Sequence, residues 1–284
     1  MAVTGKTINI PDTLQDRRFD YSIDQRTGFE TRNILGLPIL NHRQEVLGVI
    51  EIINKRRGSF DDRDIRIMDG LSSIIAIAID NALLLAEQDR QFRSIVEVMA
   101  ASIDAKDSLT AGHSAQVTKY AVGIARELGF SGTELEVISL AGMLHDYGKL
   151  GVDDRILKKP GRLTAEEYGQ IQQHVTLTRS ILNKMRLARK YRNVPEVAAA
   201  HHEYLDGSGY DSGMTAKEIP FMAKIITVAD VFDALTSKRH YRDALPVNLA
   251  LGQLENDAGS KYEPGIIAAL KDYLAREKKI PSGN

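Results

Sequence analysis

Residues 141–152 read AGMLHDYGKLGV, an apolar run that ends in a histidine, an aspartate, a glycine and a lysine. A helix C-terminus explains Gly148 as a left-handed stop and Lys149 as a cation at the negative end of the helix dipole. It gives no reason for His145 and Asp146 at the end of a hydrophobic helix. A functional reason for this pair therefore requires partners elsewhere in the sequence.

Composition limits the class of protein. The 284 residues are 43% hydrophobic and 26% charged, which is ordinary for a soluble chain of two domains. The net charge of −1 provides no overall field for nucleic acid or an anionic membrane, so we expect neither DNA nor a membrane as a partner. The absence of cysteine excludes disulfides and thiolate zinc sites. Without a secretory signal, and with apolar stretches that look too short for a bilayer, a cytoplasmic location is expected.

The N-terminal part predicts strands and then one long helix. Short strands are expected at 6–10, 33–40 and 46–54, the last continuous enough for a central strand. The pattern is helical over 67–105 and contains a heptad seam. A helix lying on its own domain would show a similar stripe, but a position between two domains favours a dimer connector. The seam consists of Leu71, Ala78, Leu85, Phe92 and Met99, with Ile75, Ala82, Val96 and Ile103.

The remainder of the chain is helical in pattern. Amphipathic segments recur at 112–130, 134–146, 164–185, 194–205, 223–237 and 264–279. The predicted fold class is mainly α, with an all-helical domain joined by a long connector helix to a small α+β domain. The predicted boundaries are 1–66 for the α+β domain, 67–105 for the connector and 91–284 for the helical domain.

Five of the seven histidines lie in the helical segments, together with two carboxylates in apolar surroundings. A single histidine in such a place is more often a hydrogen-bonded core residue, but five together favour a metal site. Asp230 would carry a heavy desolvation cost without a cation. Seven donors are too many for one tetrahedral ion, whereas two ions that share Asp146 use them all. The predicted ligands are His113, His145, Asp146, His174, His201, His202 and Asp230.

Several spaced motifs then resemble one known family. HDYGK at 145–149, KPGRLTAEEY at 159–168, HHEYLDGSGYDSG at 201–213 and VADVFDALTSKRHYR at 228–242 are similar to the HD-GYP family, a branch of the HD superfamily. The resemblance extends from about Ser94 to Leu270 and implies an HD-superfamily helical fold.

The resemblance implies a metal-dependent phosphodiesterase. The implied reaction is hydrolysis of cyclic di-GMP to pGpG or GMP by a hydroxide that bridges two divalent ions, with Asp146 and Lys149 as catalytic residues. Nitrogen and oxygen donors suit iron, manganese or zinc, and the family favours iron first and manganese next. Members with a third metal have a glutamate where this chain has Leu109, so two ions are expected.

Further site residues follow from the same resemblance. A solvated charge run is an alternative interpretation of Arg162 and Arg242, and helix capping or solvation is the alternative for Asp233. The expected supporting residues behind the ligands are Asp233, Glu203 and Asp206. The expected substrate contacts are Lys149, Lys158, Arg162, Tyr210, Arg239, Tyr241 and Arg242.

Three positions depart from the family pattern. Asp211 replaces the proline of G-Y-P, Tyr147 replaces a small aliphatic residue, and His240 replaces the proline of R-P-Y. Loss of proline is expected to free the backbone, and Asp211 to add negative charge near an anionic ligand. Slow turnover, or a cyclic di-GMP receptor that signals to a protein partner, is therefore an alternative. A hydrolase of another cyclic dinucleotide, such as 3′,3′-cGAMP, is a second alternative.

The N-terminal part resembles the second half of a GAF domain, in TGKTINIPDTLQDRRFD (4–20), TGFETRNILGLPI (27–39) and LGVIEIINKRRGSFDDRD (47–64). The opening helix and strands of that fold have no counterpart here, which implies a truncated module. We expect it to serve a homodimer formed through this domain and the connector helix. A diguanylate cyclase or another signalling protein is the further expected partner.

Overall fold

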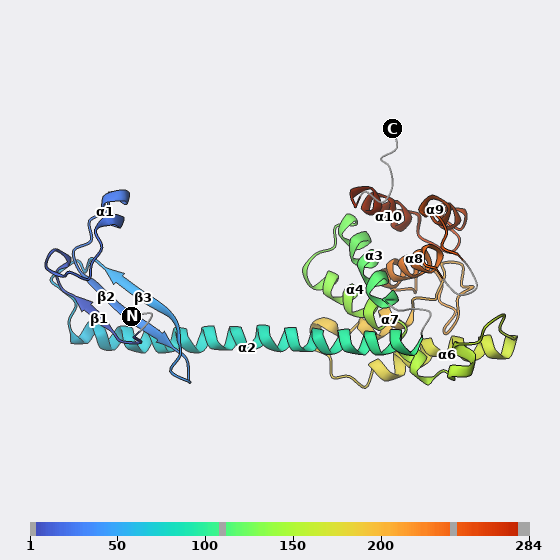
Figure 1. The fold of residues 1–284 in the computed structure, drawn as a ribbon, viewed down its shortest axis with the longest axis horizontal. Coiled ribbons are helices and arrows are strands. Elements are labelled where there is room, and N and C mark those ends of the chain that lie inside the picture. The colour runs from blue at the N-terminus through green and yellow to red at the C-terminus, as the bar shows by residue number, and fades with distance from the viewer. Residues whose placement is uncertain (1–3, 108–111, 239–242, 278–284) are drawn as a thin grey trace. The chain divides into compact units, whose positions relative to one another are not determined.

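The computed structural model describes residues 4–107, 112–238 and 243–277, and these form two compact units. The first unit, residues 1–91, contains a small sheet, and the second, residues 92–284, is helical (Figure 1). Helix α2 (Asp62–Lys106) begins in the first unit and ends in the second. The predicted mainly α fold with a small sheet is confirmed.

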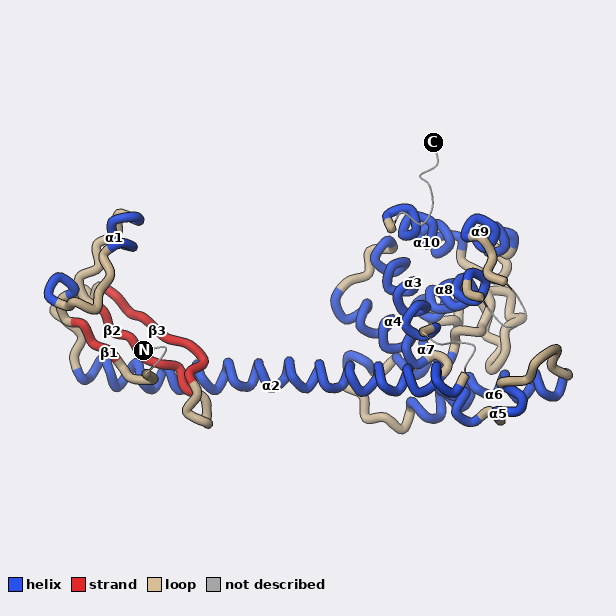
Figure 2. The backbone as a smooth tube through the Cα atoms, viewed as in Figure 1, coloured by secondary structure: helices blue, strands red, loops and turns tan. Residues whose placement is uncertain are grey.

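The sheet has three antiparallel strands in the order β1-β2-β3 (Figure 2). The strands are β1 (Ile8–Ile10), β2 (Ile34–Leu40) and β3 (Val46–Ile53), followed along the chain by α2 and interrupted by η1 (Thr13–Gln15) and α1 (Ser22–Thr27). The central strand is β2, where Leu35 and Leu37 are fully buried. The prediction of a central β3 is wrong, because in the described residues β3 pairs only with β2 and exposes Ile53.

The N-terminal half of α2 covers this sheet. Ile65 and Met68 pack against the buried cluster of Leu35, Leu37 and Phe60. One turn later, the Ser72 hydroxyl donates a hydrogen bond of 2.7 Å to the Pro38 carbonyl. This face of α2 therefore packs against the sheet of its own domain.

The C-terminal end of α2 packs into the core of the helical unit. Val96 is fully buried in the core of that unit, and Ile103 is 2% exposed. The predicted heptad seam turned both residues toward a partner helix, and that prediction is wrong. Two other residues of the predicted seam, Leu71 and Leu85, do have exposed side chains on α2.

Helix α2 contains a segment with the composition of a membrane span. One 18-residue window has a mean hydropathy of 1.6, and only 11% of it is buried. The expectation that every apolar stretch is too short for a bilayer is therefore wrong by length and composition.

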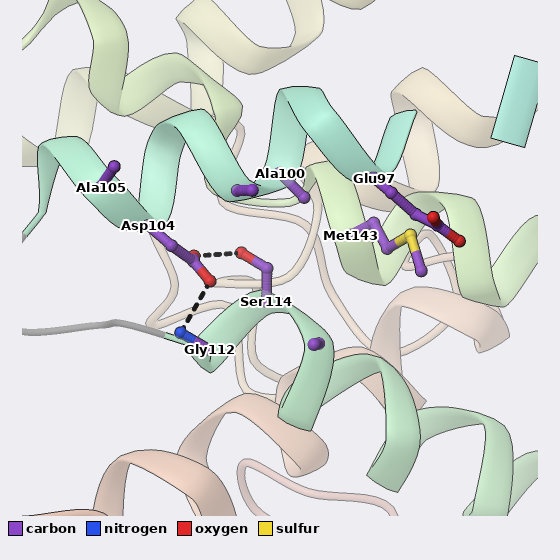
Figure 3. A pocket seen from close by; sticks show the side chains of 9 residues that line it. Glu97, Ala100, Asp104, Ala105, Gly112, Ser114 and Met143 are labelled. Atoms are coloured by element: carbon purple, nitrogen blue, oxygen red, sulfur yellow. Dashed lines mark hydrogen bonds between the residues drawn. The ribbon is translucent and has the colours of Figure 1, made fainter. Parts of the chain in front are cut away.

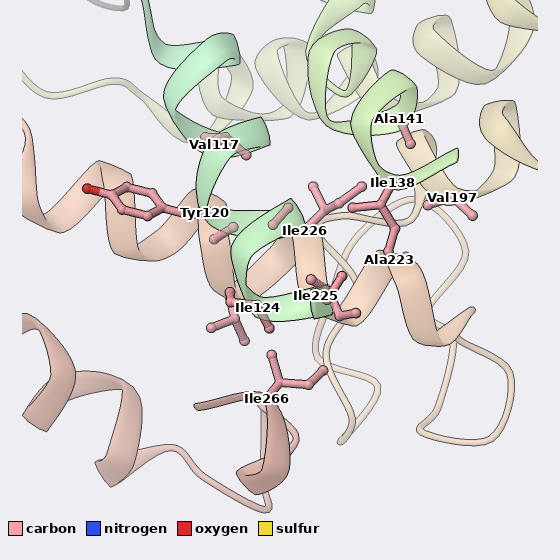
Figure 4. Packing of buried hydrophobic residues seen from close by; sticks show 14 of the residues in the cluster. Val117, Tyr120, Ile124, Ile138, Ala141, Val197, Ala223, Ile225, Ile226 and Ile266 are labelled. Atoms are coloured by element: carbon pink, nitrogen blue, oxygen red, sulfur yellow. The ribbon is translucent and has the colours of Figure 1, made fainter. Parts of the chain in front are cut away.

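The helical unit packs around α3, which contacts α4, α8 and α10. Ile124, Ile138, Ile225 and Ile226 are fully buried at these contacts (Figure 4). Helix α9 had not been predicted. The elements are α3 (His113–Glu127), α4 (Gly132–Leu144), η2 (Tyr147–Gly151), α5 (Asp154–Leu157), α6 (Ala165–Leu182), η3 (Arg189–Tyr191), α7 (Val194–Ala199), α8 (Phe221–Thr236), α9 (Val247–Asn256) and α10 (Pro264–Arg276).

The simplest interpretation of the sequence made Gly148 a left-handed helix stop, and the structure contradicts it: Gly148 lies within η2 and does not have a positive φ. Helix α4 ends at Leu144, and the chain turns into the short 3-10 helix η2, which lies against α6. A Cβ atom on Gly148 would lie 1.9 Å from the His174 carbonyl oxygen. The Gly148 N–H also donates to the Thr178 hydroxyl at 2.8 Å. Glycine is required because two backbones meet here.

Replacing Gly148 with alanine is expected to lower the free energy of unfolding of the metal-free protein by about 1–3 kcal/mol, because η2 and α6 must move apart. Chemical denaturation followed by circular dichroism measures this loss. Gly169→Ala is the matched control on α6, since a Cβ atom there meets nothing within 4 Å. The control should leave stability unchanged or raise it by about 0.4–1 kcal/mol. Equal effects of the two substitutions would contradict the close approach.

Candidate metal centre

Three of the seven predicted metal ligands lie within helices that are distant in the sequence, and the other four lie within three residues of the ends of α4 and α7. His113 opens α3, and Asp230 lies within α8. All seven are buried except His202, which is half-buried. The structure brings them together as two groups of possible metal ligands, whose donor atoms lie within 4.8 Å of one another in each group. The groups are Asp146, His174, His201 and His202, and His113, His145 and Asp230.

Asp146 lies between the two groups and presents one carboxylate oxygen to each. Its Oδ1 atom is 3.3 Å from His174 Nε2 and 3.9 Å from His201 Nε2. Its Oδ2 atom is 3.4 Å from His145 Nε2 and 3.9 Å from His113 Nε2. This is the arrangement that a carboxylate bridging two cations requires. The donor set therefore fits a binuclear site.

Backbone carbonyls orient three of the imidazoles. In each case the Nδ1 atom lies 2.7 Å from the carbonyl oxygen three residues earlier, so Nδ1 carries a proton and Nε2 is the nitrogen that has a lone pair whenever the ring is neutral. The Nε2 atom of His145 is buried without a hydrogen-bond partner among the described residues, as a metal ligand would be. The pairs are His145 with Gly142, His174 with Ile171, and His201 with Ala198.

His113 is held by carboxylates instead. Its Nδ1 atom lies 2.7 Å from Asp233 Oδ2, and its Nε2 atom lies 3.1 Å from Asp230 Oδ1. Asp233 is thus placed behind a predicted ligand, where the sequence analysis expected it. A carboxylate in this position fixes the ring and raises the basicity of the ligand nitrogen.

The two groups differ in charge when metal is absent. Burial lowers the pKa of His113, but hydrogen bonds to Asp230 and Asp233 outweigh it and raise that pKa to about 10. Burial also opposes protonation of His145, yet the nearby Asp146 raises its pKa. Burial lowers the pKa of His174, and it lowers the pKa of His202 to about 3. One group therefore holds protons at neutral pH, and the other does not.

Lys149 lies beside the bridging carboxylate. Its ammonium nitrogen is 2.7 Å from Asp146 Oδ2 and 3.1 Å from Asp107 Oδ2. Burial lowers the pKa of Lys149, but these two carboxylates outweigh it and raise that pKa, so the side chain stays charged. The sequence analysis missed Asp107. Asp107 precedes His113 by six residues, and that proximity in the sequence was the one sign of a role at the site. It was not enough for a prediction, because the sequence does not show that Lys149 pairs with it.

The last turn of α2 also holds the backbone of η2. The Lys106 ammonium donates to three carbonyls, those of Lys149, Leu150 and Val152, at 3.0, 2.8 and 2.9 Å. Three hydrogen bonds from one ammonium group to carbonyls within four residues hold η2 and the residue that follows it in place. Lys106 therefore fixes the segment from which Lys149 projects.

The same turn of α2 holds the beginning of α3. The Asp104 carboxylate accepts hydrogen bonds from the Gly112 N–H at 3.0 Å and the Ser114 hydroxyl at 2.7 Å (Figure 3). These bonds flank His113, the first residue of α3. They lie at the wall of a cavity of about 420 Å³, and four of its nine lining residues are alanines. Sequence reasoning did not single out Asp104 or Lys106.

The segment after His202 is folded tightly beside the ligands. The Glu203 carboxylate accepts hydrogen bonds from the N–H groups of Ser212 and Met214 at 2.8 and 3.0 Å. The Tyr210 ring stacks on His202, with 4.6 Å between ring centroids. Glu203 thus supports the loop, and Tyr210 lies at the predicted metal site.

Asp211 closes this loop, contrary to expectation. Its side chain is 5% exposed and accepts a hydrogen bond from the Thr176 hydroxyl at 2.5 Å. It also forms an ion pair with Arg179, which in turn bonds Glu196 at 3.1 Å. Burial raises the pKa of Asp211, but these contacts outweigh it and lower that pKa. The prediction that Asp211 frees the backbone is wrong, because its side chain holds the loop against α6, and the negative charge that it was expected to add is paired with Arg179.

Other predicted site residues lie away from these contacts. Asp206 is exposed and accepts a hydrogen bond from the Ser208 N–H, so it stabilises a turn instead of supporting a ligand. Lys158 and Arg162 are exposed, and Lys158 pairs with Asp154 at 2.9 Å. Their substrate contacts stay predictions. The predictions for Leu109, Arg239, His240, Tyr241 and Arg242 fall outside the described residues.

Restoring the family proline is expected to damage the protein. Asp211 has a φ of 102°, which proline cannot adopt, and the substitution also removes the contacts to Thr176 and Arg179. Asp211→Pro should therefore destabilise the fold by about 1–3 kcal/mol more than Asp211→Gly, which keeps the backbone conformation. Thermal unfolding of both variants measures the difference. A proline variant as stable as the native chain would contradict the conclusion that Asp211 holds this loop against α6.

Metal uptake is expected to reach two ions per chain and to release protons at one site only. The group with His113 must lose a proton, because the pKa near 10 lies above neutral pH. Its apparent affinity should rise with pH between about pH 6 and 8, while that of the group with His202 stays flat. Elemental analysis gives the stoichiometry, and calorimetry with manganese in buffers of different ionisation enthalpy counts the protons.

Asp233→Asn is the control for this titration. It removes one of the carboxylates that raise the pKa of His113, so proton release at neutral pH should fall while the second site is unaffected. Uptake of a single ion, or equal pH dependence at both sites, would contradict the charge asymmetry.

Comparison with known proteins agrees with this site. The HD domain family matches residues 97–266, more than half of the chain, and the GAF domain family matches residues 1–79. The structure of Bd1817, an HD-GYP-type protein from Bdellovibrio bacteriovorus, has a TM-score of 0.50 at 14% identity and covers 85% of this chain and 99% of its own. That likeness concerns the fold alone.

Curated relatives are similar over the helical part. A 3′3′-cGAMP-specific phosphodiesterase of Vibrio cholerae is 41% identical over 186 residues, or 66% of this chain and 40% of the relative. A cyclic di-GMP phosphodiesterase of Thermotoga maritima is 37% identical over 186 residues, again 66% of this chain and 50% of the relative. The chain thus spans half or less of the length of these two relatives. The chain belongs to the HD domain family, and its N-terminal part matches the GAF domain family.

Proposed function

We propose that this chain hydrolyses a phosphodiester bond of cyclic di-GMP, giving pGpG or GMP. The observation that carries the proposal is the pair of buried His/Asp groups that face opposite oxygens of Asp146. Two divalent ions, when bound, supply Lewis acidity and lower the pKa of water, which is the chemistry that phosphodiester hydrolysis needs. The nitrogen and oxygen donors suit iron first and manganese next in this proposal.

The chain's own residues have distinct roles in the proposed reaction. Lys149 is a charged, buried donor next to Asp146, so it is placed to bind a phosphate oxygen and to stabilise the charge that develops there. Asp107 positions Lys149 from the other side. The Tyr210 ring, stacked on His202, offers a flat surface for a base.

A second candidate substrate is 3′3′-cGAMP. The relative specific for that nucleotide is 41% identical to this chain, against 37% for the cyclic di-GMP phosphodiesterase. A receptor without turnover is less well supported, because the charge of Asp211 is balanced by Arg179. A cytoplasmic location and a diguanylate cyclase partner stay predictions.

Turnover is tested by loading the protein anaerobically with iron(II) or with manganese(II) and incubating it with each cyclic dinucleotide. We expect linear product, measured by chromatography, with cyclic di-GMP favoured. Faster hydrolysis of 3′3′-cGAMP would make that nucleotide the substrate in place of cyclic di-GMP. Binding without product with either metal would contradict the proposed activity and leave the receptor function as the remaining alternative.

Lys149→Gln serves as the test of mechanism. It should lower kcat about 10²–10³-fold while two ions remain bound, because a donor to the phosphate is lost and the ligands are intact. Lys119→Gln, which changes an exposed lysine of α3, is the control and should have native activity. Unchanged turnover in Lys149→Gln would remove this residue from the mechanism.

A further inference from the structure

One side-chain hydroxyl joins α6 to the segment that carries His145 and Asp146. Thr178 lies on α6, one helical turn after the predicted ligand His174, and is fully buried. Its Oγ1 atom donates a hydrogen bond of 3.1 Å to the His145 carbonyl and accepts the bond of 2.8 Å from the Gly148 N–H. A threonine hydroxyl has one donor and two acceptor sites, so it can make both bonds at once. The two bonded backbone groups flank Asp146 in the chain.

Thr178 differs from two other buried threonines on helices of this unit. The hydroxyls of Thr118 and Thr227 donate to the carbonyl four residues earlier in their own helix, at 2.7 and 2.9 Å. That is a common bond of a helical threonine. The Thr178 hydroxyl instead bonds backbone groups that are 30 and 33 residues earlier in the chain. It therefore joins two separate segments of the fold.

The two segments touch where these bonds form. A Cβ atom on Gly148 would lie 1.9 Å from the His174 carbonyl oxygen and 2.6 Å from the Thr178 backbone nitrogen. A valine at position 178 would put a methyl group where the hydroxyl lies, so water could not take over its bonds. A buried N–H without a partner is costly, so the segment would shift toward other partners.

A second side chain holds the next part of the same segment. The Lys106 ammonium, on α2, donates to three carbonyls, of which the first is that of Lys149 at 3.0 Å. Thr178 thus fixes the backbone up to Gly148, and Lys106 fixes it from Lys149 onward. The charged groups of Asp146 and Lys149, 2.7 Å apart, lie where these two attachments meet.

We propose that Thr178 and Lys106 are positioning residues that fix the places of Asp146 and Lys149 at the metal centre. Thr178 ties Asp146 to α6, which also carries His174, and Lys106 ties Lys149 to α2. The inference rests on the proposed hydrolysis. Because a misplacement of about 1 Å can cost about 10²-fold in rate, loosening this segment should slow the chemical step. Substrate binding should change little, since Thr178 is buried and the Lys106 ammonium is occupied by carbonyls.

Two substitutions of Thr178 separate the hydroxyl from the shape of the side chain. Thr178→Val should lower kcat about 10–100-fold at saturating manganese, with KM within a few fold of native and both ions still bound. Thr178→Ser keeps the hydroxyl and should restore kcat to within a few fold of native. Thr227→Val is the matched control, because its hydroxyl bonds its own helix. Native kcat in Thr178→Val, or equal losses in the valine and serine variants, would overturn the proposal.

Two further measurements need no substrate, so they distinguish this inference from the proposed activity. In the metal-free protein the Gly148 amide should exchange its hydrogen about tenfold faster in Thr178→Val than in Thr178→Ser, while the amide of Ile226 in the core stays unchanged. Manganese should bind Thr178→Val about tenfold more weakly than the native chain. Equal exchange at Gly148 and native manganese affinity would overturn the positioning role, whereas an inactive native chain would contradict only the proposed activity.

Lys106→Met tests the second attachment and does not place a new group in the core. It should lower kcat about tenfold or more with KM within a few fold of native, because the backbone of Lys149 is released. Lys119→Met, which changes an exposed lysine of α3, is the control and should have native kcat. Native kcat in Lys106→Met would overturn the role of Lys106.

Discussion

A buried carboxylate among imidazoles is the constraint on which the helical unit depends. Asp146 is 5% exposed and within 4 Å of the imidazole nitrogens of four histidines, which lie in α3 and α6 or just after the ends of α4 and α7. A charge in that position is tolerable only with opposite charge close by. Lys149 and protonated imidazoles supply it without metal, and cations supply it with metal. The helices therefore have one relative arrangement in which this group is stable.

The end of α2 transmits that arrangement to the rest of the chain. Asp104 fixes the beginning of α3, Lys106 fixes the backbone of η2, and Asp107 pairs with Lys149. Three side chains within one helical turn thus hold two segments that carry predicted site residues.

The ligand set was predictable because each histidine and aspartate is chemically conspicuous in an apolar helix. Asp233 was placed in the same way, three residues after Asp230 on one helix face. Lys106 and Asp104 were not predictable, since a charged residue near a helix end is ordinary. Their roles depend on carbonyls and N–H groups that come near only in the folded chain. Asp211 was misjudged because its partner, Arg179, lies 32 residues earlier on α6.

The sequence by itself determined the helical fold class, the long helix α2 and the seven donors, because these depend on residue type and local spacing. Tertiary structure alone decided which oxygen of Asp146 faces which group, which strand is central, and which side of α2 stays exposed. These features depend on what packs against each face, and a periodic pattern does not specify its neighbour. Val96 shows the difference: its heptad position suited a partner helix, but the core of its own chain buries it completely.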